Sequence, residues 1–217
     1  MIRLTLLIII VFSSIYFFNK NDFSSTIERV DIEGQFIYSN EKSITEKAKL
    51  FIGKNLYDID LRFHKSEFEK MPWVKNSQIS IKPPNRLVLK IVEHTPIFLW
   101  NESSYVNNEM YTFVTPNLPI ENILRLSSNG DSYESVYELY QSIQSYLLDI
   151  DESIHALSKQ DDMLDIRTKN LTIIVRYSRY QEKMREFVSI YPDLKSKLKN
   201  RKKIHVDLRY ATGFAVR

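Results

Sequence analysis

The sequence predicts an α+β protein with an N-terminal transmembrane helix and two folded regions. Residues 4–18 form an uncharged apolar run close to the start of the chain. Residues 27–95 contain a strand pattern, two amphipathic helix patterns and a hairpin pattern, in that order. Residues 96–217 contain many short strand patterns and two helix patterns, which together are typical of a mainly antiparallel sheet with helices on one face.

Composition limits the classes of function. The 217 residues are 43% hydrophobic, which is typical of folded domains, and they carry a formal net charge of +3. So small a charge over this length does not by itself indicate a nucleic-acid partner. The absence of cysteine excludes disulfides, thiolate metal sites and cysteine nucleophiles.

The apolar run of residues 4–18 lies between Arg3 and Lys20. It is slightly shorter than the roughly 20 residues of a spanning helix, and flanking residues extend it. A cleaved signal peptide is the alternative interpretation, but the bulky aromatic residues 16–18 stand where signal peptidase requires small ones. Such aromatic residues are typical of a membrane interface. We therefore expect residues 1–20 to form a short cytoplasmic end and an uncleaved anchor.

The first folded region begins with a short strand pattern over residues 27–34. Ser43 and Glu46 form a capping-box pattern, which predicts a helix that begins at Ser43 and ends at Gly53. A second amphipathic helix follows and ends before Pro72. Its inner face is expected to carry Leu61, Phe63, Phe68 and Met71.

A hairpin completes this region. Residues 74–81 and 86–92 alternate apolar with polar side chains, and Pro83-Pro84-Asn85 joins them. The order strand, helix, helix, strand, strand predicts a small α+β unit whose helices cover one face of the sheet.

The second folded region has more elements. A helix is expected over residues 133–148 and another over about 181–191, ended by Pro192. The strand patterns lie at residues 97–100, 105–106, 110–114, 123–126, 163–166, 171–177 and 204–210.

The last of these strand patterns alternates Ile204, Val206, Leu208 and Tyr210 with polar residues. The alternation predicts a strand with one buried face. A terminal strand either closes the sheet or lies at an edge where another chain can pair with it. The alternation leaves open whether Tyr210 packs in the core or faces a partner.

Neither catalysis nor metal binding is indicated by the polar residues. The four histidines have no metal-ligand spacing, and a glycine-rich phosphate loop and a Gly-x-Ser-x-Gly elbow are both missing. Asp58 and Asp60 are expected to be turn and helix-cap groups rather than a catalytic pair. The basic run of residues 195–203 is interpreted as a solvated helix end, because no aromatic residues interleave it as they would in a nucleic-acid site. Binding of this run to phosphate or to a membrane surface is the alternative.

Several segments resemble the FtsQ/DivIB family of bacterial cell-division proteins. Those of the first region resemble a single POTRA domain of the kind this family carries: Asn55–Asp60, Met71–Lys75, Pro84–Leu87 and Glu93–Pro96. In the second region, Val206–Arg217 resembles the family's closing strand, and Lys183 lies where the family carries a lysine. The turn Thr168–Leu171 departs from the pattern because it lacks the expected glycine.

The resemblance implies a non-enzymatic divisome scaffold of the inner membrane at the division septum, without a cofactor. Its amino terminus would be cytoplasmic and its domains periplasmic, and it would link early and late division proteins by binding the bitopic proteins FtsB and FtsL. The alternative is a POTRA-containing subunit for outer-membrane protein assembly or secretion, which would predict tandem POTRA units or a following barrel.

The expected partner-binding residues follow from the same resemblance. A partner strand could pair with the final strand by β-augmentation. Arg209 would contact a partner carboxylate, Tyr210 would be the aromatic anchor, and Gly213 would let the partner backbone come close. The full expected set is Arg209, Tyr210, Ala211, Thr212, Gly213 and Phe214.

Overall fold

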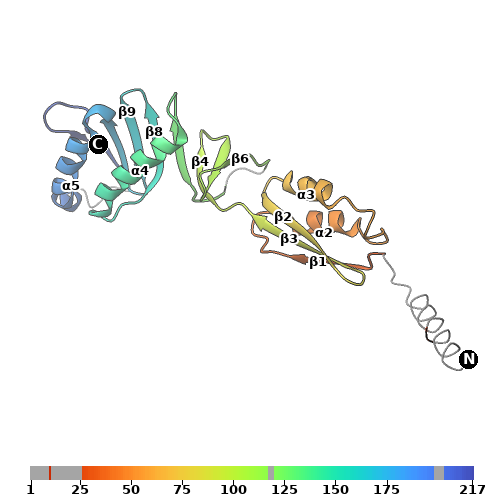
Figure 1. Ribbon diagram of the computed structural model, residues 1–217. Helices are drawn as coiled ribbons and strands as arrows, with labels where there is room; N and C mark the ends of the chain where they lie inside the picture. Colours follow the sequence, from red (N-terminus) through yellow and green to blue (C-terminus); the bar gives the residue numbers. More distant parts are fainter. Residues whose placement is uncertain (1–9, 11–25, 117–119, 198–202) are drawn as a thin grey trace, which may run out of the picture. The chain divides into compact units, whose positions relative to one another are not determined.

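The computed structural model describes residues 10, 26–116, 120–197 and 203–217 (Figure 1). The chain divides into two compact units, Met1–His94 and Thr95–Arg217. The expected membrane helix lies outside the described residues, apart from Ile10. Among the helices that are described, none combines the length and apolar character needed to cross a bilayer.

The first unit has the predicted order of strand, helix, helix, strand and strand. Its elements are β1 (Arg29–Glu33), α2 (Glu41–Lys49), α3 (Leu61–Glu69), β2 (Val74–Lys82) and β3 (Arg86–Glu93). The strand order is β1-β3-β2, with β1 parallel and β2 antiparallel to β3. Because Arg29 pairs with Arg86, the start of β1 lies at the same end of the sheet as the β2–β3 turn.

The first helix differs from its prediction at both ends. Asn40 is the cap of α2, since its side chain accepts a hydrogen bond from the backbone N–H of Ser43 at 3.2 Å. The helix ends at Lys49 rather than Gly53, which lies in the following turn with φ +83°. Asn40 and Ser43 are equally good caps by residue type, and the backbone decides between them.

The second helix is rotated relative to its expected inner face. Phe68 is buried as expected, but Phe63 is exposed. Its neighbour His64 lies closer to the core and packs edge-on against Phe51, with ring centroids 4.7 Å apart. As expected for a cap, the Asp60 side chain accepts the backbone N–H groups of Arg62 and Phe63.

The second unit is built on a nine-stranded sheet. Its elements are β4 (Pro96–Trp100), β5 (Ser104–Asn107), β6 (Thr112–Phe113), β7 (Leu124–Ser128), α4 (Tyr133–Leu148), β8 (Ile154–Gln160), β9 (Met163–Thr168), β10 (Leu171–Arg176), the 3₁₀ turn η1 (Tyr177–Arg179), α5 (Tyr180–Lys197), β11 (Ile204–Asp207) and β12 (Ala215–Val216). The strand order is β12-β11-β10-β9-β8-β7-β4-β5-β6.

Most neighbouring strands are antiparallel, but three pairs are parallel. The parallel pairs are β4–β7, β7–β8 and β10–β11. Helix α4 connects β7 to β8, and α5 connects β10 to β11. A helical crossover of this kind returns the chain in the same direction, which explains why these two pairs are parallel within the predicted, mainly antiparallel sheet.

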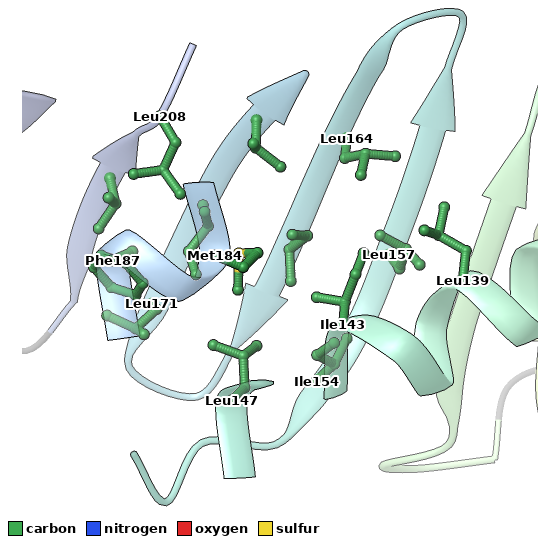
Figure 2. Packing of buried hydrophobic residues seen from close by; sticks show 14 of the residues in the cluster. Leu139, Ile143, Leu147, Ile154, Leu157, Leu164, Leu171, Met184, Phe187 and Leu208 are labelled. Carbon is green, nitrogen blue, oxygen red and sulfur yellow. The ribbon is translucent and has the colours of Figure 1, made fainter. Parts of the chain in front are cut away.

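Both helices cover the same face of the sheet, as predicted (Figure 2). Leu139, Ile143 and Leu147 of α4 and Met184 and Phe187 of α5 face the strands. The strand residues beneath them include Leu157, Leu164, Leu171 and Ile173, all buried. This core fixes the position of β10 and β11, beside which the chain ends.

The second unit departs from the sequence prediction at three places. Strand β8 is not among the predicted strands, because a bulge between Ile154 and Ala156 interrupts its alternation and shifts its register against β9. Pro192 lies inside α5, where the buried ring of Tyr191 packs in the core and favours continuation of the helix. The final strand ends at Asp207 instead of Tyr210.

Candidate partner-binding site

The expected partner-binding residues lie in the connection between β11 and β12. Beyond Asp207 the chain leaves the sheet, turns, and returns antiparallel to β11, with Val206 opposite Val216. Because β11 pairs with β10 on one side and β12 on the other, its backbone is not available to a partner strand. The edge of the sheet is therefore β12, and not the strand over residues 204–210 that the sequence predicts.

The turn begins with an internal ion pair. The guanidinium of Arg209 donates to both carboxylate oxygens of Asp207, from Nε at 2.8 Å and from Nη2 at 2.6 Å. These hydrogen bonds hold the pKa of Asp207 below its usual value. The sequence predicts that Arg209 contacts a partner carboxylate, whereas in the structure its guanidinium is already bonded to Asp207 of the same chain. A partner carboxylate would have to share or displace this contact.

The tip of the turn is exposed. Tyr210 is 53% exposed and is not part of the core, so the structure excludes the core position that the alternation left open for it. Ala211, Thr212 and Gly213 follow it on the surface. Phe214 differs from them, because it is half-buried and its ring stands edge-on to Phe187, with centroids 6.1 Å apart.

Gly213 has a conformational role within the turn. Its φ of +69° lies in the left-handed region, which favours glycine. A Cβ built on Gly213 would meet no atom within 4 Å. The chain's own packing therefore leaves open space at Gly213, and glycine is favoured there because of the backbone conformation of the turn.

A shallow hollow lies beside this turn, on the sheet face that α4 and α5 leave uncovered. The face is identified by the alternation of β10, in which Leu171 and Ile173 point to the helices and Thr172 and Ile174 point away. The hollow is lined by Thr172, Ile174, His205, Val206, Asp207 and Arg217.

Glu152 is a residue that the sequence pattern did not reveal. It is 2% exposed, and its carboxylate accepts hydrogen bonds from the Thr168 hydroxyl and from Nδ2 of Asn170, the latter at 2.8 Å. The Thr168 hydroxyl in turn accepts the backbone N–H of Leu171 at 2.9 Å. These contacts hold the β9–β10 turn without the glycine that the resemblance led us to expect.

The same turn supports the start of β11. The backbone N–H of Ile204 donates to the carbonyl of Asn170 at 2.9 Å. Burial raises the pKa of the Tyr191 hydroxyl, and the neighbouring Glu152 carboxylate raises it further. Glu152 thereby links α5 to the β9–β10 turn, which in turn holds the start of β11, at the opposite end of this strand from the candidate turn.

Lys183 and the basic run of residues 195–203 lie outside the β11–β12 turn. Lys183 is buried on the inner side of α5, and its Nζ contacts Oε2 of Glu186 at 2.8 Å. Of the basic run, Lys195 and Lys197 are exposed in the last turn of α5, and residues 198–202 lie outside the described ones. Within the described part of the chain, no three His, Asp or Glu side chains are grouped so that they could hold a metal ion.

The POTRA-like signature residues have structural roles in the first unit. Trp73 is buried and stacks on Tyr38, with ring centroids 4.5 Å apart. Glu93, at the end of β3, accepts the backbone N–H groups of Ile37, Tyr38 and Ser39 at 2.9, 3.1 and 2.7 Å. Trp73 and Glu93 thus fix the loop between β1 and α2.

The Glu93 contacts predict a pH-dependent contribution to stability. Burial alone would raise the pKa of Glu93, but hydrogen bonds from the backbone N–H groups of residues 37–39 hold it below its usual value. A carboxylate with a lowered folded-state pKa stabilises the fold above its unfolded pKa, and that stabilisation is lost as the pH falls through the folded pKa.

We therefore expect Glu93→Gln to lower the stability of the first unit by about 1–3 kcal/mol near pH 7, because three N–H groups lose a charged acceptor. The difference from the parent should shrink in acid. Denaturant unfolding can be followed by Trp73 fluorescence in a Trp100→Phe background, since the chain has two tryptophans. Glu33→Gln, at an exposed acid of β1, is the control; an equal loss in both variants would contradict the assignment.

The fold defines a class: a small α+β unit with the strand order β1-β3-β2, followed by a sheet-based unit with an exposed C-terminal turn. The family model "POTRA domain, FtsQ-type" matches residues 25–94. The model "Cell division protein FtsQ/DivIB, C-terminal" matches residues 98–209. The chain belongs to the FtsQ/DivIB family of cell-division proteins.

Relatives named "Cell division protein FtsQ" match most of the chain. The one from Alcanivorax borkumensis is 26% identical over 88% of this chain and 75% of its own length. The one from Coxiella burnetii is 30% identical over 67% and 61%, and the one from Neisseria gonorrhoeae is 24% identical over 94% and 83%. The C-terminal family match stops at residue 209, so Tyr210–Phe214 lie just beyond it.

Proposed function

We propose that the protein is a non-enzymatic divisome scaffold that binds FtsB- and FtsL-type bitopic proteins through the β11–β12 turn. Exposure of Tyr210 at the tip of a turn that is anchored on both sides is the observation that carries this proposal. An aromatic side chain held at the surface is the residue type that dominates binding hot spots. A partner strand would pair with the edge of β12 beside it.

We further assign residues 1–20 to a cytoplasmic end and a membrane anchor, 27–95 to the POTRA domain and 96–217 to the β-domain. The uncharged run of residues 4–18 between Arg3 and Lys20 supports the anchor. In this arrangement the anchor spans the inner membrane once, the domains are periplasmic, and the protein joins early and late division proteins at the septum.

A membrane pull-down with the full chain as bait tests the proposed partners. We expect recovery of short bitopic proteins with coiled-coil sequences. Recovery of outer-membrane barrel proteins instead would favour the alternative, a POTRA-containing subunit for outer-membrane assembly or secretion. A bait with Tyr210→Ala separates specific capture through the turn from general retention on the membrane.

A reporter fused after Arg217 tests the topology. We expect an enzyme that is active only outside the cytoplasm to be active there. Activity of a reporter that works only in the cytoplasm would contradict the proposed orientation. The same two reporters fused after Lys20 give the matched control for expression, because that fusion ends directly behind the proposed anchor.

A further inference from the structure

Exposed apolar side chains gather at one end of the first unit. The start of β1 and the β2–β3 turn lie at this end of the sheet. The α2–α3 connection, residues 50–60, joins it, because Thr26 forms a β-bridge with Asn55 and the Ile27 N–H donates to the Lys54 carbonyl at 2.9 Å. We call this region the Thr26 end.

The apolar residues of the Thr26 end come from the α2–α3 connection and the first turn of α3. His64 links these two segments, since its ring contacts Phe51 at 4.7 Å and Phe63 at 5.3 Å between centroids. The exposed members are Leu50 (68%), Ile52 (50%), Tyr57 (86%) and Phe63 (56%). Exposed apolar groups that are concentrated in one place mark an interaction surface, whereas scattered ones need no explanation.

The position of this surface along the chain indicates what covers it. Seven residues, 19–25, separate the apolar run of residues 4–18 from Thr26. Seven residues span at most roughly 25 Å when fully extended. If residues 4–18 lie in a bilayer, the Thr26 end is therefore held close to the surface of that bilayer.

The charges around the apolar residues are compatible with an anionic lipid surface. Lys49, Lys54, Arg62 and Lys82 are exposed at this end, together with the acidic residues Glu28, Asp58 and Asp60. Asp60 also caps α3, so part of its hydrogen-bonding capacity is used within the protein. Lysine and arginine near an anionic leaflet are attracted to it, while apolar side chains and tyrosine enter the headgroup region.

We propose that the Thr26 end is a lipid-contact surface that docks the first unit onto the anionic leaflet carrying the anchor. Leu50, Ile52 and Tyr57 enter the headgroup layer, and Lys49 and Lys54 contact lipid phosphates. The proposal rests on the membrane anchor of the proposed function.

The absence of cysteine makes a site-specific test possible. Asp58→Cys places one thiol beside Tyr57 without removing an apolar residue, and an environment-sensitive fluorophore is attached to it. Ile37→Cys is the control, because Ile37 is 72% exposed but lies far from the Thr26 end. Its backbone N–H donates to Glu93, the last residue of β3, whereas the Thr26 end lies beside Arg86, the first residue of β3. The labelled full chains are reconstituted into vesicles of phosphatidylglycerol and phosphatidylethanolamine that contain headgroup spin-labelled lipid.

We expect lipid-borne quenching to be several-fold stronger at position 58 than at position 37. Adding Leu50→Ser and Tyr57→Ser to the position 58 variant should reduce quenching to the level of position 37. Equal quenching at both positions, or energy transfer between labelled copies, would overturn the proposal; the latter would indicate a second copy as the occupant. Flotation with the vesicles after alkaline washing tests the anchor separately, since failure of the anchor removes flotation itself.

Discussion

Replacement of Tyr210 by alanine is expected to remove most of the capture of FtsB- and FtsL-type partners while the fold persists. An aromatic hot spot contributes about 2 kcal/mol or more, which corresponds to a roughly 30-fold increase in Kd. Because Tyr210 is 53% exposed, its truncation removes little buried apolar area. The free energy of unfolding should therefore change by less than about 1 kcal/mol. Quantitative pull-down and denaturant unfolding of the full chain in detergent check the two effects.

Gly213 needs a more careful substitution than Tyr210. Gly213→Glu would combine a bulky charge with a positive φ, a strain of about 1–2 kcal/mol, so lost binding could come from a distorted turn. Gly213→Asn is the better probe, because asparagine tolerates the left-handed region. If a partner backbone approaches Gly213, the asparagine variant should bind weakly but unfold like the parent.

The Tyr210 prediction has its own contradicting outcome. If Tyr210→Ala lost as much stability as a variant of a core residue, Tyr210 would have to contribute to the core, and its assignment to the binding site would be wrong.

The sequence predicts elements whose side chains pack in a regular period. Helix α4 has the bounds that the sequence predicts, residues 133–148, because Val136, Leu139, Ile143 and Leu147 keep one apolar face over about three turns. Strand β8 was missed because the bulge after Ile154 breaks the alternation on which strand prediction depends.

The end of β11 shows a different reason for error. Leu208 continues the alternation of Ile204 and Val206 and is buried, but it lies outside the strand. Its backbone N–H donates to the carbonyl of Ile174 at 2.8 Å, after which the chain turns away. A side-chain pattern reports burial and does not report where a backbone stops pairing.

The candidate site depends on contacts that a sequence pattern cannot show. The ion pair between Arg209 and Asp207 joins residues only two positions apart, yet it forms at the point where the chain turns toward β12. Glu152 holds the start of β11 through Thr168 and Asn170, which lie 16 and 18 residues further along the chain. A single acidic residue after a helix carries no signal of burial, so tertiary structure alone identifies its role.

Replacement of Phe187 by alanine should have the largest effect on stability. Phe187 is fully buried in α5, where it contacts Tyr191 and Phe214 with ring centroids 5.4 and 6.1 Å apart. Truncation of such a residue leaves a cavity and costs about 3–5 kcal/mol. Phe187→Leu keeps most of the volume and should cost less than about 1.5 kcal/mol. Denaturant unfolding of the full chain measures both variants.

The contact between Phe187 and Phe214 also connects this core to the exposed turn. Because Phe214 closes the turn that begins at Arg209, removal of the Phe187 ring should loosen residues 209–214 even under conditions where the second unit stays folded. Hydrogen exchange at those residues should then be faster in Phe187→Ala than in Phe187→Leu, and partner capture should fall with it. If Phe187→Ala loses stability but hydrogen exchange in residues 209–214 is unchanged, the core supports only the sheet and not the turn. The contact of Arg209 with Asp207 and the pairing of β12 would then be sufficient to hold the turn.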